Sequence, residues 1–370
     1  MKYFQLILLL VITNLSFGEV RVSLLTTTPG DQSHALFGHS ALRVVNEEYD
    51  YEEVFNFGWF DFGTPNFPLR VLKGDLEYWL GLQSVDNFIA LNNKEERLIS
   101  EQVLDLSDTK AASILLDLIE NRKEENRYYF YSFTQKNCAT EIRDLFLKYQ
   151  LIGSREVVNQ TYRQALNSYL DEHLWYKFGM NAIMGNFVDQ TMTWEDQLFL
   201  PDNLATAVAA SPGLVKEKNE LNEINREPNS KFVRILTSPW LIFSVLFVVC
   251  VFYRPKWLRF TLYLFLGILG AFSLYLWMTS LHPELQNNFN LLWANPLYLL
   301  ILPIIGSLGR RKIPAYFIAG CLFLVPIFWM FGIQGYDWQI IPLLGVLWLY
   351  SIQDLKQIRL NSKLNKSLSH

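Results

Sequence analysis

The distribution of apolar residues along the chain is the feature that most limits how it can fold. Five apolar runs separated by short connections make up the sequence from residue 235 onward, at residues 235–253, 260–280, 289–308, 313–332 and 336–352. Each run is long enough to cross about 30 Å of hydrocarbon as a helix. We therefore predict an all-α bundle of five transmembrane helices over residues 235–353, followed by a tail over residues 354–370.

Basic residues in the connections predict the orientation of these runs. Residues 231–370 contain 12 Lys+Arg and 3 Asp+Glu, and ten of the twelve lie in the connections after the first and third runs and in the tail. The other two connections contain no Lys or Arg. Because basic loops of membrane proteins face the cytoplasm, the C-terminus is expected in the cytoplasm and residues 19–234 on the exported side.

Composition excludes several classes of protein. The chain is 51% hydrophobic and 18% charged, and residues 1–230 hold 20 Lys+Arg against 33 Asp+Glu. An acidic first part joined to an apolar, basic second part disfavours a single globular enzyme, a disordered acidic protein and a nucleic-acid-binding protein. The interiors of the runs lack Asp, Glu, Lys and Arg, which disfavours an ion pump or proton-coupled transporter and favours a lipid-handling or anchoring bundle.

The first 18 residues, MKYFQLILLLVITNLSFG, predict export. They have one early lysine, an apolar stretch and two small residues, Ser16 and Gly18, at the spacing of a cleavage site. This pattern is typical of a secretory signal peptide, and the alternative is an uncleaved N-terminal anchor. Either interpretation exports the domain that follows, in agreement with the orientation of the apolar runs.

Residues 19–211 predict an exported α+β domain, joined to the membrane region by a polar linker over residues 212–234. Strand-length alternation of apolar residues predicts strands at 20–26, 40–45, 53–57, 98–104 and 128–133. Apolar residues at helical spacing predict helices at 107–120 and 138–149. Strands mixed with helices in this order indicate the α+β class.

One cysteine lies in the exported domain. Cys250 and Cys321 fall inside apolar runs, which leaves Cys138 without a partner for a disulfide within its domain. Asn137 is a suitable N-cap, so Cys138 is expected in the first turn of a helix, where free N–H groups and the helix dipole favour the thiolate. A nucleophile is one interpretation, and a small buried apolar residue is the other.

A thiolate nucleophile usually needs a base, and the exported domain contains three histidines: His34, His39 and His173. His39 directly precedes a predicted strand, whereas His34 lies in a loop and His173 in an apparent helix. Residue types and spacing alone favour His39 as the base only slightly over His34 and His173. Many single histidines are structural, so a Cys–His pair stays a hypothesis at this point.

An ordered set of motifs carries a family resemblance. The two that bear the candidate residues are FGHSALRV at 37–44 and NCATEIRD at 137–144. Five further motifs occur between, around and after them, at residues 55–67 (FNFGWFDFGTPNF), 73–80 (KGDLEYWL), 96–106 (ERLISEQVLDL), 198–204 (LFLPDNL) and 282–297 (HPELQNNFNLLWANPL). The set resembles the Lnb-type bacterial lipoprotein N-acyltransferases, which have an exported N-terminal domain and a C-terminal membrane region of several spans.

The resemblance implies a fold and a set of catalytic residues. The exported domain is expected to be a circularly permuted papain-like fold, similar to the lecithin–retinol acyltransferases and the NlpC-type peptidases, with histidine before cysteine in the chain. Cys138 corresponds to the nucleophile and His39 to the base. Asn56, on the strand that ends FNFG, is our candidate for the third residue that orients the histidine, and a turn residue at a strand end is the alternative.

Further residues are expected near the substrates. Arg43 and Tyr131 could line the cleft, although a tyrosine in a strand is often a packing residue. Asn137, next to the nucleophile, is a third candidate for substrate contact. In the exported loop at 281–290, His282 and Asn288 could bind lipid head groups or dock the catalytic domain, and a simple polar turn is the alternative.

The activity that the resemblance implies is transfer of a fatty acyl chain from a phospholipid to the N-terminal amine of a diacylated lipoprotein, through an acyl–Cys138 thioester. The implied location is the bacterial inner membrane, with the catalytic domain on the periplasmic side. No cofactor or metal is expected, because the sequence has neither zinc-ligand spacing nor a glycine-rich phosphate loop. The alternatives are a membrane-anchored cysteine hydrolase, acting on phospholipid esters or cell-wall peptides, and a noncatalytic assembly factor that binds lipoproteins.

Overall fold

A computed structural model describes residues 19–154, 156–224, 231–304 and 312–368. The predicted signal peptide at residues 1–18 lies outside the described residues. The chain divides into two compact units, which we call the sheet unit (residues 1–67, 76–158 and 192–226) and the helical unit (residues 68–75, 159–191 and 227–370). Each unit is described below by itself.

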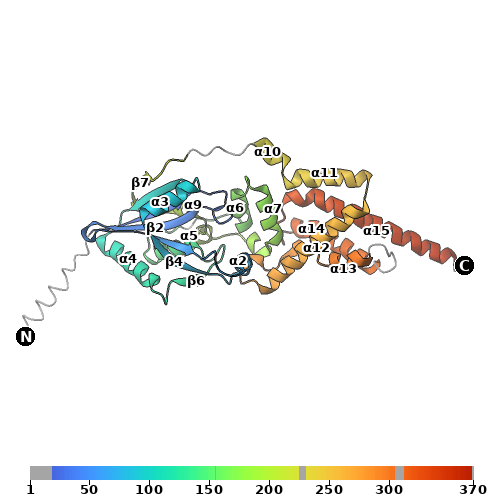
Figure 1. Ribbon diagram of the computed structural model, residues 1–370, viewed down its shortest axis with the longest axis horizontal. Helices are drawn as coiled ribbons and strands as arrows, with labels where there is room; N and C mark the ends of the chain where they lie inside the picture. The colour runs from blue at the N-terminus through green and yellow to red at the C-terminus, as the bar shows by residue number, and fades with distance from the viewer. Residues whose placement is uncertain (1–18, 155, 225–230, 305–311, 369–370) are drawn as a thin grey trace, which may run out of the picture. The chain divides into compact units, whose positions relative to one another are not determined.

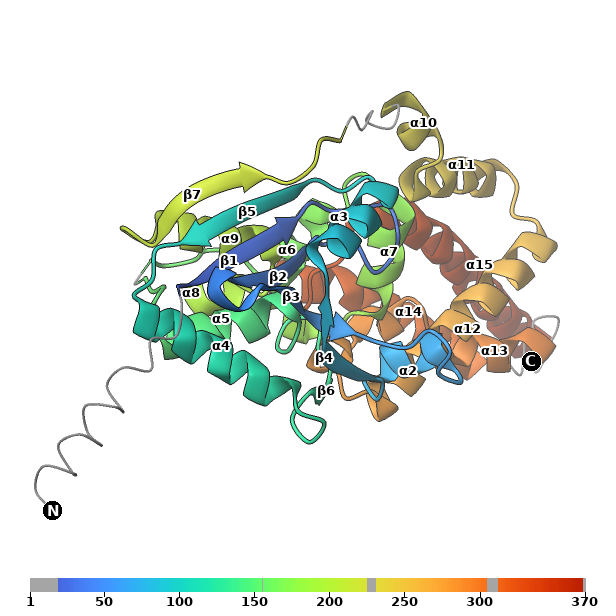
Figure 2. The same ribbon diagram turned by 60° about the vertical axis from the view of Figure 1, so that its left-hand side comes forward.

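The sheet unit is built on an antiparallel sheet. Within the described residues seven strands pair in the order β6-β4-β3-β2-β1-β5-β7. Their bounds are β1 Val20–Thr27, β2 His39–Asn46, β3 Tyr51–Trp59, β4 Glu77–Gln83, β5 Ile99–Leu104, β6 Tyr128–Phe130 and β7 Val215–Glu220. Figure 2 shows β5, β1, β2 and β3 side by side, with α4 and α5 along one side of them.

Alternation along the strands divides the core between the two faces of the sheet. Leu24, Leu42 and Phe55 face one side, where they pack with residues of α4, α5 and α9. Leu25 and its neighbours in β2 and β3 face the other side, where they pack with Phe88 of α3. Successive side chains of a strand point to opposite faces, so both faces of the central strands are covered by helices. The helices of this unit are α3 Val85–Lys94, α4 Asp108–Arg122, α5 Cys138–Lys148, α8 Trp194–Gln197 and α9 Pro201–Ala210, with a 3-10 turn η1 at Glu47–Tyr49.

Two strands of the sheet differ from the sequence-based expectation. The tyrosine-rich strand expected at 128–133 is shorter, because β6 ends at Phe130. Residues 215–220, expected within the polar linker at 212–234, form β7, which pairs with β5 at the edge of the sheet. Its sequence, VKEKNE, is rich in charged residues. Charged side chains are common on edge strands because they prevent pairing with a further strand. The linker prediction was therefore wrong for this segment.

The helical unit contains most of the apolar runs. Its elements are α6 Tyr162–Tyr169, α7 Leu174–Ile183, α10 Lys231–Leu236, α11 Pro239–Phe252, α12 Lys256–Thr279, α13 Leu297–Ile301, α14 Lys312–Met330 and α15 Ile341–Leu368, with 3-10 turns η2 Asn186–Asp189, η3 Pro283–Leu285, η4 Phe289–Leu292, η5 Leu302–Ile304 and η6 Trp338–Ile340. A further helix, α2 Phe67–Lys73, begins in the sheet unit and continues into this one.

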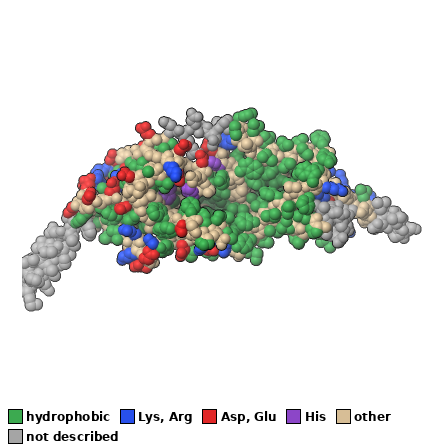
Figure 3. Space-filling view, viewed as in Figure 1, with side chains coloured by type: hydrophobic (Ala, Val, Ile, Leu, Met, Phe, Trp, Pro, Cys, Tyr) green, Lys and Arg blue, Asp and Glu red, His purple; other side chains and the backbone are tan. Residues whose placement is uncertain are grey.

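Both α11 and α14 pack against α15 (Figure 1). Hydrophobic side chains cover most of the face of these helices that Figure 3 shows, whereas acidic and basic side chains gather over the sheet unit.

The five predicted spans are not confirmed. In the described residues three helical stretches are long and apolar enough to cross a membrane: Phe232–Phe252, Lys256–Thr279 and Lys312–Met330. The run expected at 289–308 is broken into η4, α13 and η5, because Pro296 and Pro303 interrupt helical hydrogen bonding. The run expected at 336–352 forms η6 and the first turns of α15, which continues into a segment with several charged residues.

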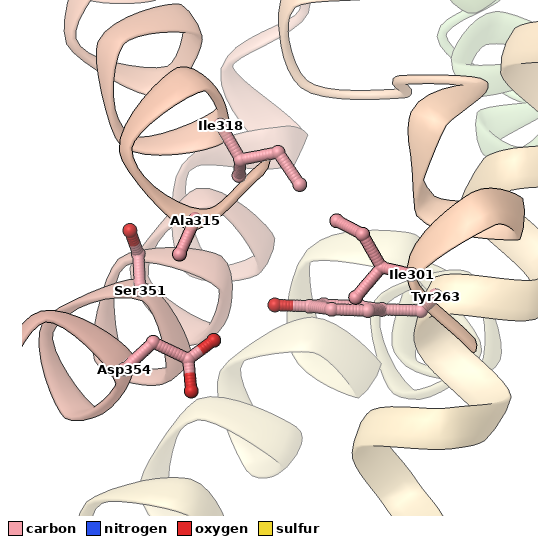
Figure 4. A pocket seen from close by; sticks show the side chains of 6 residues that line it. All are labelled: Tyr263, Ile301, Ala315, Ile318, Ser351 and Asp354. Atoms are coloured by element: carbon pink, nitrogen blue, oxygen red, sulfur yellow. The ribbon is translucent and has the colours of Figure 1, made fainter. Parts of the chain in front are cut away.

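The broken segment packs closely on α12. A Cβ atom added at Gly270 would lie 2.1 Å from the carbonyl oxygen of Ala294, so only glycine permits this approach. At the other end of α12, Arg259 donates to both carboxylate oxygens of Asp354 on α15, with Nη1 at 2.9 Å from Oδ1. A small cavity beside this pair is lined by residues that include Tyr263, Ser351 and Asp354 (Figure 4). It encloses about 10 Å³, room for about one water molecule.

Two segments predicted as parts of the exported domain belong to the helical unit. Residues 159–191 contact the connection after α12, where the N–H of Gly185 donates to the carbonyl of Glu284 at 2.8 Å. Residues 68–75 contact the same connection, where the N–H of Leu281 donates to the carbonyl of Lys73 at 2.7 Å. The contacts that place these segments in the helical unit are long-range and leave no local pattern in the sequence, and the extent of the exported domain stays a prediction.

Candidate active site

Helix α5 begins at Cys138 and fixes its position. The N-cap residue Asn137 accepts hydrogen bonds from the N–H groups of Ala139 and Thr140, both at 2.9 Å, and the Thr140 hydroxyl accepts from the Asn137 N–H at 2.7 Å. This capping box satisfies donors that the first turn of a helix leaves free. Cys138 is the first residue of the helix and is buried, with 8% of its surface exposed.

The start of β2 places His39 beside Cys138. Gly38, directly before it, has a φ of +76° and lies so close to β1 that a Cβ atom would be 2.7 Å from the carbonyl oxygen of Thr27. Glycine therefore permits the turn into the strand. The His39 imidazole forms a hydrogen bond with the Cys138 sulfur, and its Nε2 atom lies 2.5 Å from Oδ1 of Asn56 on β3. The three residues proposed from the resemblance thus lie together.

The electrostatic environment favours a charged pair. Burial raises the pKa of the Cys138 thiol, but the His39 imidazole and N–H groups of Ser40 and Ala139 outweigh burial and lower the pKa below its ordinary value. For His39, burial lowers the pKa, but the Cys138 thiolate outweighs burial and the pKa is raised. Opposite shifts in two contacting groups favour a thiolate beside an imidazolium.

A buried arginine adds positive charge near this pair. Arg97 is 6% exposed, and its guanidinium donates to the carbonyl of Thr28 at 2.9 Å, to Glu95 at 3.1 Å and to the hydroxyl of Thr27. Burial lowers the pKa of Arg97, while the charges of Glu95 and Cys138 act against that shift. Thr27 faces His39 across the β1–β2 ladder, so Arg97 supports the strand that carries the histidine. The sequence analysis missed this residue.

An aromatic cluster of the sheet unit is formed by β4, the segment that precedes α5 and the loop after β3. Tyr131 stacks on Tyr78 with ring centroids 4.7 Å apart, and Phe60 packs edge-on against Tyr78 at 5.2 Å. Phe62, which contacts Phe60, is 66% exposed. Tyr131, predicted to line the cleft, is thus a member of a partly exposed apolar surface.

Two other predicted substrate-binding residues of the sheet unit are engaged elsewhere. Arg43 forms ion pairs with Glu52 and, at 2.9 Å, with the buried Glu101. The Asn137 side chain, besides capping α5, donates to the carbonyls of Phe133 at 2.9 Å and Phe199 at 3.0 Å. The Asn137 carboxamide is therefore fully used in positioning Cys138, whereas the Arg43 guanidinium is held by two carboxylates of the sheet unit.

The structure also gives the two predicted residues of the connection after α12 a structural role. His282 is 1% exposed and its Nε2 atom lies 2.8 Å from the carbonyl oxygen of Val71. Asn288 is fully buried and donates to the carbonyl of Ala182 at 3.0 Å. Their burial favours a structural role, and binding of lipid head groups by His282 and Asn288 stays a prediction.

Among the described residues no three His, Cys, Asp or Glu side chains gather in a way that could hold a metal ion. The three cysteines are free and buried. The groups beside the Cys138 sulfur are the His39 imidazole and the backbone N–H groups of Ser40 and Ala139.

Two family models match separate parts of the chain. A family model described as the Lnb N-terminal periplasmic domain matches residues 12–168, and one described as the Lnb transmembrane domain matches residues 229–360. No curated protein and no solved structure matches the chain. These family domains indicate a membrane protein that processes lipoproteins. The chain belongs to the Lnb-type proteins, with a periplasmic N-terminal domain and a C-terminal membrane domain.

Proposed function

We propose that this protein is a thiol-dependent acyltransferase of the bacterial inner membrane. It moves a fatty acyl chain from a phospholipid to the α-amine of the lipid-modified N-terminal cysteine of a diacylated lipoprotein. The observation that carries the proposal is the hydrogen-bonded Cys138–His39 pair, in which the thiol pKa is lowered at the start of a helix. Membership of a family of membrane proteins that process lipoproteins supports lipids and lipoproteins as substrates.

The first half-reaction forms a thioester. The Cys138 thiolate attacks the carbonyl carbon of a phospholipid ester, and the bond from that carbon to the glycerol oxygen breaks. The leaving alkoxide takes a proton from the His39 imidazolium and departs as a lysophospholipid. During attack the carbonyl oxygen becomes negative, and we assign its stabilisation to the backbone N–H of Cys138, because Asn137 accepts from the N–H groups of the next two residues.

The second half-reaction transfers the acyl chain to nitrogen. The neutral α-amine of the lipoprotein attacks the thioester carbon, an amide bond forms, and the carbon–sulfur bond breaks. The amine gives up one proton to His39, so the thiolate and the imidazolium are both restored. Each cycle therefore begins and ends with the same charges at the site.

Burial and apolar side chains support amine transfer over hydrolysis. Cys138 is only 8% exposed, which limits the access of bulk water to a thioester on its sulfur. The aromatic cluster around Tyr78 and Phe62 offers an apolar surface on the same unit, suitable for an acyl chain.

Intact-mass analysis of the full-length protein tests the proposal. Incubation with phospholipid should add the mass of one fatty acyl group at Cys138, and subsequent addition of a diacylated lipopeptide should remove it as N-acyl lipopeptide forms. The variant Cys138→Ala should form neither adduct nor product. Cys321→Ala, which removes a buried thiol of the helical unit, should behave as the wild type.

Other outcomes separate the alternatives. Loss of the adduct in water without acylation of the lipopeptide would establish a hydrolase. Absence of any adduct, with lipoprotein binding unchanged in Cys138→Ala, would establish a noncatalytic binding factor.

A further inference from the structure

A pocket of the helical unit lies between α7 and α10. It encloses about 420 Å³, a volume within the range of sites that bind small molecules. The residues that line it come from two segments about 60 positions apart in the chain, and they include Glu172, Trp175, Tyr176, Val233, Arg234 and Thr237. None of these residues takes part in the candidate active site.

A hydrogen bond between the two segments holds the pocket in shape. The N–H of Leu241 donates to the Ser238 hydroxyl at 3.2 Å, because α11 begins as a separate helix after α10. The Thr237 carbonyl accepts instead from Nε1 of Trp175 at 2.7 Å. The Trp175 ring also packs edge-on against Phe243 of α11, with ring centroids 6.2 Å apart. One indole therefore fixes α7 to the break between α10 and α11.

The pocket lies at the periplasmic end of a candidate span. The stretch Phe232–Phe252 is long and apolar enough to cross a membrane, and Arg234 belongs to its first turn. Among the described residues no candidate span lies between this stretch and the periplasmic domain matched at 12–168, so its first turn is at the periplasmic surface. Trp175 and Tyr176 are exposed beside it, as aromatic side chains commonly are at the level of lipid head groups.

Two opposite charges lie side by side in the pocket without forming a close pair. Nη1 of Arg234 lies 3.8 Å from Oε1 of Glu172, which is too far for a hydrogen bond, and both side chains are partly exposed. The neighbouring acid, Asp171, differs because it accepts from Lys177 at 2.7 Å. Arg234 and Glu172 can therefore each bind a further group, one of them negative and the other positive.

A zwitterionic lipid head group matches this arrangement. A phosphodiester accepts charge-assisted hydrogen bonds from a guanidinium group, and a primary ammonium group donates up to three hydrogen bonds, for which the Glu172 carboxylate is an acceptor. Aromatic rings beside the pocket also attract an ammonium group. Farther along the span, one face of α11 exposes apolar side chains at helical spacing, among them Ile242, Val245 and Val249, which suit acyl chains.

We propose that this pocket binds the head group of phosphatidylethanolamine in the periplasmic leaflet, with its phosphate on Arg234 and its ammonium on Glu172. Phosphatidylglycerol has the phosphate but no ammonium, so it leaves the Glu172 carboxylate beside a second negative charge. The pocket therefore selects between the two lipids. The proposal goes beyond acyl transfer and does not depend on it, because a lipid bound here need not be the acyl donor.

Competition between the two phospholipids tests the proposal. Full-length protein in detergent is incubated with equal amounts of phosphatidylethanolamine and phosphatidylglycerol, and the bound lipids are counted by native mass spectrometry. The wild type should bind more phosphatidylethanolamine, and Arg234→Gln should bind about tenfold less of it, through loss of a charge-assisted hydrogen bond. Glu172→Gln should bind the two lipids equally. A wild type without the preference, or an unchanged preference in Glu172→Gln, would overturn the proposal.

Two control variants change the same charges outside the pocket. Arg254→Gln removes a cation just after the other end of α11, and Asp171→Asn removes the acid next to Glu172 that Lys177 already binds. Both should bind the two lipids as the wild type does. Equal losses in Arg254→Gln and Arg234→Gln would mean that lipid binding follows net charge alone, and the pocket would not be the site.

A photoactivatable phosphatidylethanolamine locates the site in the wild type, whether or not the variants fold. A photoreactive group next to the phosphate should label the peptides that carry residues 172–176 and 233–237. Unlabelled phosphatidylethanolamine should suppress this label, whereas glycerophosphoethanolamine, which has the head group but no acyl chains, should suppress it weakly. Label only at other residues, or equal suppression by the soluble head group, would overturn a membrane lipid as the occupant.

The two proposals can fail separately. None of these measurements requires acyl transfer, so a confirmed head-group site with no acyl–Cys138 adduct would reject the proposed function alone. An acyl adduct that transfers to lipopeptide, with the wild-type lipid preference retained in Glu172→Gln, would reject the head-group site alone.

Discussion

Both units bury polar side chains, and one buried pair in each unit shows two different uses of such groups. In the helical unit all three guanidinium nitrogens of Arg163 donate, two of them to Asp189 at 2.7 and 3.0 Å and the third to Asn181 at 2.8 Å. In the sheet unit the buried Cys138 thiol and His39 imidazole form a pair in which the thiol pKa is lowered and the imidazole pKa is raised. A buried charge whose hydrogen bonds are all formed stabilises one structure. A buried acid–base pair with shifted pKa values can instead exchange a proton. We therefore expect substitutions in the Arg163–Asp189 pair to change the free energy of unfolding, and substitutions in the Cys138–His39 pair to change the rate of reaction.

The largest effect should come from His39. His39→Gln removes the group that exchanges a proton with Cys138, so we expect acyl transfer to fall by about 10²–10⁴. The thiol pKa should rise, because the imidazole is the main group that opposes the effect of burial. The initial rate of acyl transfer and the rate of Cys138 alkylation, both at neutral pH, measure these two effects.

The matched control for this prediction is His34→Gln. His34 belongs to the same domain but pairs with Glu95 at 3.4 Å near the surface, and it should leave both rates close to those of the wild type. A similar loss in both variants would show that the sheet unit responds to any histidine change, and the assignment of His39 would fail.

Breaking the Arg163–Asp189 pair should have the next largest effect, on stability instead of chemistry. Arg163→Met leaves the carboxylate of Asp189, with 12% side-chain exposure, without its partner, and we expect a loss of about 3–5 kcal/mol in the free energy of unfolding. Denaturant titration in detergent measures this loss. The double variant Arg163→Met/Asp189→Leu should recover much of it, because no uncompensated charge remains.

The exposed pair Lys177–Asp171 provides the control for the buried pair. Asp171 has 67% side-chain exposure, so Asp171→Asn should cost less than about 1 kcal/mol. Equal losses in Arg163→Met and Asp171→Asn would contradict the distinction between matched buried charge and surface charge.

Local patterns account for the parts of the fold that the sequence predicts. Alternating apolar residues locate β1, β2, β3 and β5, and an N-cap serine or asparagine locates α4 and α5. The edge strand β7 was missed because its exposed, charged residues resemble a linker. The interruption at Asn295 and Pro296 was overlooked because hydropathy alone does not register the missing N–H of proline.

Contacts at long sequence separation explain what the sequence could not predict about the site. Cys138, His39 and Asn56 were proposed from the motifs that contain them, and they lie together. Arg97 acts through hydrogen bonds to Thr27 and Thr28, about 70 residues away in the chain, and carries no local signal. The burial of His282 could not be predicted for the same reason, since its polar connection gives no sign that residues 68–75 cover it.

The smallest expected effect concerns the charge of Arg97. The reactive ion pair exists at pH values between the lowered pKa of Cys138 and the raised pKa of His39. As the pH rises through the pKa of Cys138, the rates of alkylation and transfer should both increase. Above the pKa of His39, the rate of transfer should fall. Arg97⁺ stabilises the thiolate and opposes the imidazolium. Arg97→Met should therefore move both limbs of the transfer profile to higher pH, by about half a unit each.

Arg97→Lys keeps the charge but loses the fork of hydrogen bonds to Thr27 and Thr28, so it should leave the limbs in place while lowering stability. Limbs that move equally in both variants would mean that Arg97 acts on the site through strand position and not through its charge.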